Sequence, residues 1–249
     1  MRSRRPDDAK REAWQHELML DLAQRGCPAC RVASRLAGRF LEALFWESVN
    51  DPALRSELRA AHGFCRPHTM RAAALAQAKG YTTGMAILYA DLLGHLDAEA
   101  EQVAATRRGL LGSRRVGRGE RLTPHAECPV CASSRWAVDG YLELLARRAA
   151  DSEVGLAARD TGRGLCVAHL RRGLTLFPGR TERHALLEIF RRRLRELRSS
   201  LGEYVRKHGY QFQHERIERN ETDAWRDAVE LVAGESDAIR KKPGRGRED

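Results

Sequence analysis

A pattern of cysteine and histidine occurs twice in this chain of 249 residues and is the part of the sequence best suited to chemistry. Each copy consists of a CPxC motif, a gap of 34 residues and a CxxH motif, and each of these cysteines and histidines recurs 101 positions later. All six cysteines of the chain belong to the pattern. The eight residues are Cys27, Cys30, Cys65 and His68 in the first copy and Cys128, Cys131, Cys166 and His169 in the second.

Three thiolates and one imidazole form a closed tetrahedral set of the kind that binds structural zinc. In CxxH, a spacing of three residues on a helix places both side chains on one face. Two antiparallel helices within the gap would bring the CPxC motif of each copy beside its CxxH motif. We therefore predict two zinc ions, each bound by the four residues of one copy. Because protein groups fill all four positions, no water could be activated at the metal, which argues against catalysis there.

Three other interpretations of the same residues remain open. Iron–sulfur clusters tolerate histidine among their ligands, and such clusters would make the chain a redox or electron-transfer protein. A CPxC motif can also form a thiol–disulfide pair, although such motifs normally stand in a βαβ setting. The cysteines and histidines could finally be unrelated core residues, and the constant offset would then be a coincidence. The chain has no phosphate-binding loop, dinucleotide fingerprint or nucleophile elbow, and we assign no catalytic residue.

The duplication extends beyond the cysteines. Phe40 aligns with Tyr141 and Gly63 with Gly164 at the same offset, without a gap. Apolar residues recur at helical spacing in both copies, and no segment alternates convincingly as a strand would. The sequence therefore predicts an all-α protein made of two tandem, pseudo-symmetric helical repeats with a 101-residue offset, each clamped by a Cys3His metal site.

Turn and capping residues predict where the helices begin and end. In the first copy, Asp51 and Pro52 suit an N-cap and a first helical position, and Gly63 breaks the chain before the CxxH motif. We expect helices there over 31–49 and from Pro52 to about Ala61, then one that ends at about Ala78 and a long one from about Thr82 to Arg107. We divide the chain into a first repeat (1–108), a Gly/Arg-rich linker (109–124), a second repeat (125–210), an arm and helix (211–234) and a disordered basic tail (235–249).

The segment after the second repeat has its own pattern. Tyr210 and Phe212 alternate like a short extended arm, and a closing helix follows to about Val232. We expect this helix to bury one side, formed by Trp225, Ala228, Val229 and Val232.

The chain is basic. Lysine and arginine outnumber aspartate and glutamate by 44 to 34, a formal net charge of +10. This excess favours an anionic partner, whether a nucleic acid, a ribonucleoprotein or an acidic protein. The candidate contacts are arginines of the linker and of one face of a later helix. They are Arg107, Arg108, Arg114, Arg115, Arg118, Arg121, Arg191, Arg195 and Arg198.

The sequence lacks targeting signals of two kinds. No apolar run is long enough to span a membrane, and the N-terminus has no apolar core after its arginines, as a secretory signal would. We therefore expect a cytoplasmic protein without a membrane partner, in a compartment where paired cysteines more often hold metal than form disulfides.

With the two CPxC…CxxH pairs, the segment AILYADLL and the closing segment YVRKHGYQF…AWRDAVELVAG, the chain resembles an uncharacterised bacterial protein family over about residues 15–234. The resemblance implies two helical halves followed by the terminal segment, and metal-ligand status for the eight matching cysteines and histidines. It implies no activity, and the arginine-rich linker and basic tail lie outside the recognisable pattern.

Overall fold

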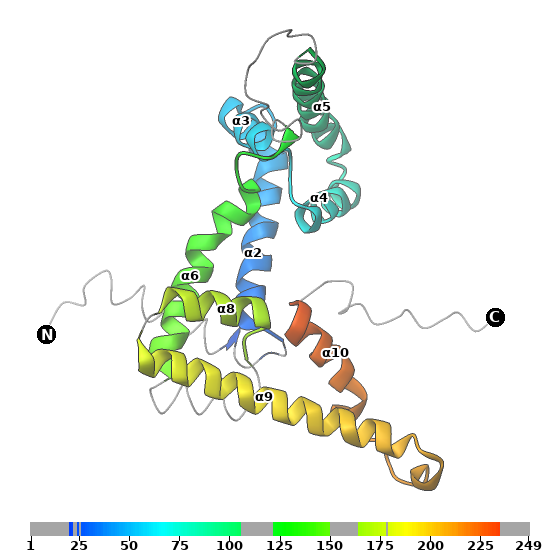
Figure 1. The fold of residues 1–249 in the computed structure, drawn as a ribbon. Helices are drawn as coiled ribbons and strands as arrows, with labels where there is room; N and C mark the ends of the chain where they lie inside the picture. Colours follow the sequence, from blue (N-terminus) through cyan, green and yellow to red (C-terminus); the bar gives the residue numbers. More distant parts are fainter. Residues whose placement is uncertain are drawn as a thin grey trace, which may run out of the picture. The chain divides into compact units, whose positions relative to one another are not determined.

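The computed structural model describes residues 20, 21, 24, 26–105, 122–149, 164–177 and 179–234. Within these ranges the regular structure is entirely helical, with eight α-helices, a π-helical segment and a 3-10 turn, which confirms the predicted all-α class (Figure 1). The elements are α2 (Pro28–Ala43), η1 (Leu44–Ser48), α3 (Pro52–Ala60), α4 (Arg66–Lys79), α5 (Thr82–Ala105), α6 (Pro129–Ala149), α8 (Val167–Leu176), α9 (Arg180–Lys207), η4 (Tyr210–Phe212) and α10 (Arg219–Ala233).

The chain divides into two compact units whose boundaries fall inside helices. Unit 1 comprises the residues up to Ala33 and those from Ala137 onward, and unit 2 comprises Ser34–Trp136. Helix α2 begins in unit 1 and ends in unit 2, whereas α6 begins in unit 2 and ends in unit 1. Each unit therefore contains parts of both sequence copies. Most of the expected linker 109–124 and the whole tail 235–249 lie outside the described residues.

Unit 2 encloses an apolar core between α2, α3, α4, α5 and the first turn of α6. Its fully buried members include Leu41, Ala72 and Val130. The predicted start of α3 is confirmed, because the Asp51 carboxylate accepts a hydrogen bond of 2.7 Å from the Ala53 amide and Pro52 is the first helical residue.

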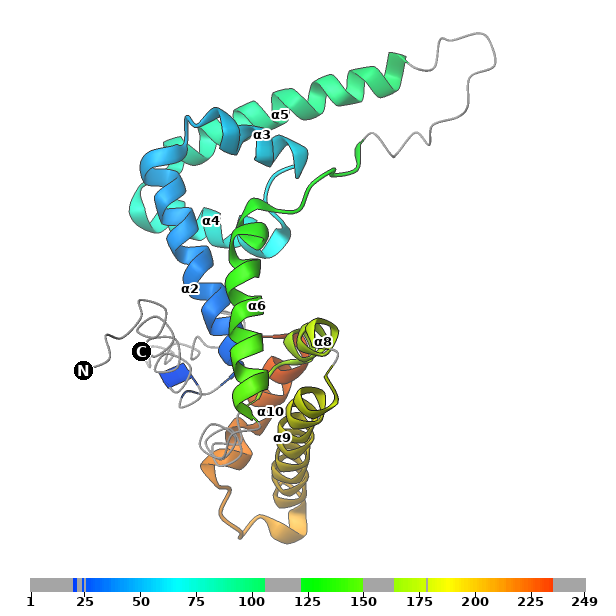
Figure 2. The same cartoon turned by 90° about the vertical axis from the view of Figure 1, so that its left-hand side faces the viewer.

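In unit 1, α9 and α10 form an antiparallel hairpin joined by η4, and both pack on α8 (Figure 2). Near the turn, Lys207 binds the Glu221 carboxylate at 2.7 Å, and farther from it Arg193 binds Asp227 at 2.5 Å. The Glu221 side chain also accepts from the Glu218 amide at 2.8 Å as part of a capping box that begins α10. Between the helices lie Phe190, Leu197 and Leu201 of α9 and Ala224, Ala228 and Leu231 of α10.

Two expectations for the closing segment are wrong. Tyr210 and Phe212 belong to a 3-10 turn and not to an extended arm. Helix α10 is confirmed, but Trp225, Val229 and Val232 are exposed, and of the expected side only Ala228 packs inward. The small residues Ala224 and Ala228 permit a close approach of the two helices, so the helix turns this side inward and leaves the larger side chains outside.

Candidate metal centres

The structure brings the eight cysteines and histidines into two groups of four. Centre I contains Cys27, Cys30, Cys166 and His169, and centre II contains Cys65, His68, Cys128 and Cys131. Within each centre the four ligand atoms, cysteine Sγ or histidine nitrogen, all lie within 4.8 Å of one another, so each group could hold a metal ion. Centre I lies within unit 1 and centre II within unit 2.

The predicted pairing within each copy is wrong. Each centre combines the CPxC motif of one copy with the CxxH motif of the other. Helix length explains the difference: the 16 residues of α2 extend about 24 Å, whereas the nine residues of α3 extend about 13.5 Å. The short α3 cannot lead the chain back to Cys27 and Cys30, so Cys65 and His68 meet the other copy's CPxC motif instead.

All four motifs place their residues at the N-terminus of a helix in the same way. The first cysteine directly precedes the helix and the second ligand is its third residue, in α2, α4, α6 and α8 alike. The Cys166 carbonyl accepts the first helical hydrogen bond, from the Leu170 amide at 2.8 Å, and the Cys128 carbonyl accepts that from Ala132 at 3.0 Å. Proline at the first position of α2 and α6 fits because that position needs no amide hydrogen.

This placement has an electrostatic consequence. Each centre lies at two helix N-termini, where unpaired backbone N–H groups and the helix dipole favour negative charge. The backbone around each centre therefore favours a negatively charged ligand set.

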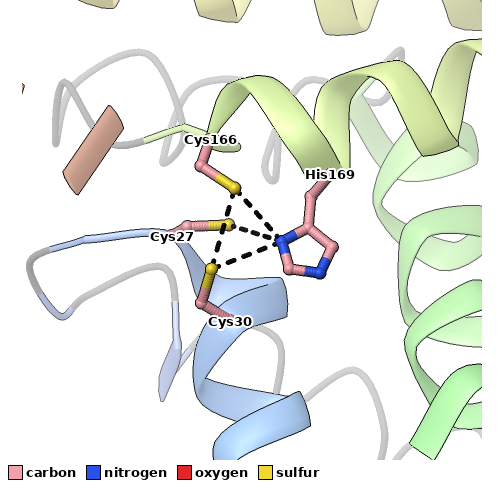
Figure 3. Close-up of side chains that lie close together, drawn as sticks. All are labelled: Cys27, Cys30, Cys166 and His169. Atoms are coloured by element: carbon pink, nitrogen blue, oxygen red, sulfur yellow. Dashed lines mark hydrogen bonds between the residues drawn. The ribbon is translucent and has the colours of Figure 1, made fainter. Parts of the chain in front are cut away.

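In centre I, the His169 Nδ1 atom faces all three sulfurs (Figure 3). The distances from this nitrogen are 3.6 Å to Cys27, 3.3 Å to Cys30 and 3.2 Å to Cys166. The Cys30 and Cys166 sulfurs are 3.7 Å apart. Cys27 and Cys166 are buried, whereas Cys30 and His169 are partly exposed.

Centre II repeats these distances. The His68 Nδ1 atom lies 3.6 Å from Cys128, 3.4 Å from Cys131 and 3.2 Å from Cys65, and the Cys65 and Cys131 sulfurs are 3.7 Å apart. Residues that correspond through the sequence offset thus occupy corresponding places in the two centres. This equality of geometry supports the interpretation of the chain as a duplication.

The thiols of one centre compete for ionisation. Burial opposes ionisation of Cys128, but hydrogen bonds from His68 and from backbone N–H groups outweigh it and lower the pKa of Cys128 to about 6. Burial and the nearby Cys128 charge raise the pKa of Cys131 to about 12. In centre I, burial raises the pKa of Cys27 well above its ordinary value. Three ionised sulfurs in such contact need a cation among them.

A polar pocket of about 200 Å³ adjoins centre I. Arg193 and Ser200 of α9 and Asn220, Asp227 and Glu230 of α10 line it together with Cys27 and Cys166. Gly234, which follows α10, approaches the same centre so closely that a Cβ atom there would lie 3.6 Å from the Cys30 sulfur. Sequence reasoning did not place α10 beside a metal centre, because none of the repeated cysteines and histidines lies in this helix.

The predicted arginine contacts divide into two groups. Arg191, Arg195 and Arg198 are exposed on α9. The linker arginines lie outside the described residues: Arg107, Arg108, Arg114, Arg115, Arg118 and Arg121. Among the helices that the structure describes, none is both long and apolar enough to cross a membrane.

Comparison with known proteins yields a family and a distant relative. The model of the family of unknown function DUF6062 matches residues 19–239. A protein of Caldicellulosiruptor sp. (strain Rt8B.4), described as an uncharacterized 23.9 kDa protein in the xynA 3′ region, is 24% identical over 208 residues, which cover 84% of this chain and 95% of that protein. No solved structure matches the chain.

Proposed function

The chain belongs to family DUF6062, and we propose that it is a zinc-binding helical scaffold or regulatory binding protein for an anionic partner. The observation that carries the proposal is the pair of Cys3His groups with matching internal distances. The partner would be a nucleic acid, a ribonucleoprotein or an acidic protein.

The distances within each centre support zinc. Around one zinc ion, with sulfur at about 2.3 Å and nitrogen at about 2.0–2.1 Å, tetrahedral geometry separates two sulfurs by about 3.8 Å and a sulfur from the nitrogen by about 3.6 Å. The corresponding separations in centre I are 3.7 Å and 3.2–3.6 Å. These separations therefore lie within a few tenths of an ångström of those expected around one zinc ion.

The alternative is a redox protein with iron–sulfur clusters on the same ligands. In such clusters the protein ligands are distributed over two or more iron atoms. Here all four ligand atoms of each centre lie within 4.8 Å of one another. This mutual contact favours a single ion over a cluster.

A structural role suits centres of this composition. Three cysteines and a histidine complete the tetrahedral coordination of zinc, which leaves no open position for a substrate or water. Each ion would join two chain segments that are far apart in sequence: Cys30 and Cys166 are separated by 136 residues and Cys65 and Cys131 by 66. Zinc would in this way hold the helices in the arrangement that presents the binding surface.

The charge of the chain supports an anionic partner. The formal net charge is +10, and the exposed Arg191, Arg195 and Arg198 of α9 supply a concentrated basic surface. Basic surfaces attract nucleic acids and acidic proteins through long-range electrostatics, and salt weakens that attraction.

Elemental analysis of the purified chain tests the metal. We expect two zinc ions per chain, one in His169→Ala, and two in the control variant His125→Ala, since His125 is exposed and belongs to neither centre. Iron with a brown colour and absorbance near ~400 nm after anaerobic purification would overturn zinc in favour of clusters. Affinity for anionic probes is expected to fall steeply with salt, and the absence of any such binding would contradict the anionic partner.

A further inference from the structure

The α9–α10 hairpin has two sides, and one of them faces centre I. The pocket beside the Cys27 and Cys166 sulfurs is lined by Arg193 and Ser200 of α9 and by Asp227 of α10, among others. These residues lie to one side of the buried contacts that hold the hairpin together. This side is therefore occupied by the metal centre and its polar pocket.

Apolar side chains are exposed on the other side. Successive residues of a helix are rotated by about 100° around its axis. On both α9 and α10, the pocket residues lie to one side of the buried row, and the exposed apolar residues lie to the opposite side of that row. Because the helices are antiparallel, the same sense of rotation on both places the two sets on one side of the hairpin. We call it the outer face, and its residues are Leu187, Leu194, Val205, Trp225, Val229 and Val232.

The outer face has the spacing of a helix-binding surface. Trp225, Val229 and Val232 follow one another at intervals of four and three residues, so they form a continuous stripe along α10. Trp225 is 47% exposed and Val232 is 67% exposed. A row of this kind, at i, i+4 and i+7, is how apolar helix faces anchor one another.

Arginines line one edge of the outer face. Arg191 and Arg198 are seven residues apart and lie beside the Leu187 and Leu194 row of α9, with Arg195 next to them. Within the described part of the chain these three arginines make no ion pair, whereas the neighbouring Arg192 and Arg193 pair with Glu196 and Asp227. Positive charge along the edge of an apolar face calls for a partner with acidic residues beside its own apolar row.

We propose that the outer face binds an acidic amphipathic helix of a partner protein, which would lie along the hairpin and contact both α9 and α10. The inference rests on the proposed function and names its anionic partner. A nucleic acid would use the arginines but leave the apolar row in water. If two copies of this chain met through their outer faces, the arginines of one would face those of the other. Each chain has a net charge of +10, so electrostatic repulsion disfavours such a dimer.

Binding of labelled probes to the zinc-loaded full chain tests the proposal. The probes are a three-heptad synthetic helix with leucines on one face and glutamates beside them, a peptide with the same residues in shuffled order, and a single-stranded RNA. Fluorescence anisotropy measures each affinity at low and high salt. We expect the amphipathic peptide to bind at least about tenfold more tightly than the shuffled peptide, a difference of about 1.4 kcal/mol.

Two variants assign the binding to the outer face. Trp225→Ala and Arg198→Glu should each weaken the amphipathic peptide by about tenfold or more. The matched controls are Ile87→Ala on α5 and Arg39→Glu on α2, exposed residues of unit 2, which should leave the affinity unchanged. Zinc content and circular dichroism of every variant show that the fold is retained.

Each outcome decides between the hypotheses. Equal affinity for the two peptides, or insensitivity to Trp225→Ala in a folded variant, refutes the helix-binding face. Tighter binding of RNA that depends on Arg198 but not on Trp225 also refutes it, while leaving the proposed zinc scaffold for an anionic partner intact. A chain that purifies without zinc contradicts the proposed function itself.

Discussion

Each centre combines motifs from both copies, so the loss of one ligand should expose the other cysteines of the same centre and not those of the same copy. In Cys166→Ser, centre I loses one of its four ligands, and Cys27 and Cys30 lose the partner that holds them. Centre II keeps all of its ligands, although Cys65 belongs to the same copy as Cys27 and Cys30. We therefore expect one zinc per chain and selective exposure of Cys27 and Cys30.

The expected loss of stability can be worked out from the separations along the chain. A crosslink between Cys30 and Cys166 spans 136 residues, and closing a loop of that length constrains the unfolded chain by about 5 kcal/mol. A link across the gap within one copy would contribute about 4 kcal/mol by the same relation. Because whole domains are stable by only about 5–15 kcal/mol, we expect unit 1 to melt at a much lower temperature in the variant.

Alkylation under native conditions followed by peptide mass mapping gives the result residue by residue. In Cys166→Ser, Cys27 and Cys30 should be modified while Cys128 and Cys131 stay protected. The mirror variant Cys65→Ser should reverse the two sets. If Cys166→Ser instead exposed Cys128 and Cys131, the ligands would pair within each copy and the description of both centres would be incorrect.

Two further predictions concern the helices around the centres. Gly63 has a φ of +93°, and a Cβ there would lie 2.9 Å from Leu92, so Gly63→Ala should destabilise unit 2 by about 1–3 kcal/mol. Gly94 has open space around it, so Gly94→Ala should instead stabilise α5 by about 0.5–1 kcal/mol. Thermal melts of the two variants test this pair of predictions, and equal shifts in melting temperature would contradict it. The bond from Lys207 holds the pKa of the Glu221 carboxyl below its ordinary value of 4.5, so its contribution to stability is complete above that value and is lost as the pH falls through the lower, folded-state pKa. The stability difference between the wild type and Glu221→Gln should therefore be full at neutral pH and shrink in acid, and a difference independent of pH would refute the role assigned to this pair.

Much of the helical structure can be predicted from local signals in the sequence. Asp51 and Pro52 mark the start of α3 as expected, and α5 begins at Thr82 as the sequence indicates. These features depend on a few neighbouring residues, whose capping and backbone preferences act locally. The identity of the eight candidate ligands follows equally well, because the repeated spacing selects them.

The pairing of the motifs could not be predicted in this way. Cys65 and Cys166 have the same local surroundings in the sequence, so the ligand types are compatible with either partner. The decision depends on how far α2 extends before the chain turns, including the π-helical segment Leu44–Ser48 that continues it. Such a segment departs from ordinary helical hydrogen bonding and has no sequence pattern of its own.

The orientation of α10 was mispredicted for a related reason. Its larger apolar residues, Trp225, Val229 and Val232, suggested a single buried side. The helix in fact contacts α9 through Ala224, Ala228 and Leu231. Alanine is only weakly hydrophobic, yet its small side chain permits close packing between helices. A helix with apolar residues on two sides therefore does not reveal which side is buried.

Neither half of this chain alone carries the complete ligand set of either centre. Severed within the linker, the polypeptide would yield two fragments, each carrying two ligands of centre I and two of centre II, and only their reassociation could complete the coordination. An ancestor that consisted of one copy would have reached the same arrangement by pairing two identical molecules that traded ligands across their symmetry axis. Duplication of the gene for such a dimer and fusion of the two copies would make that pairing a permanent property of one polypeptide.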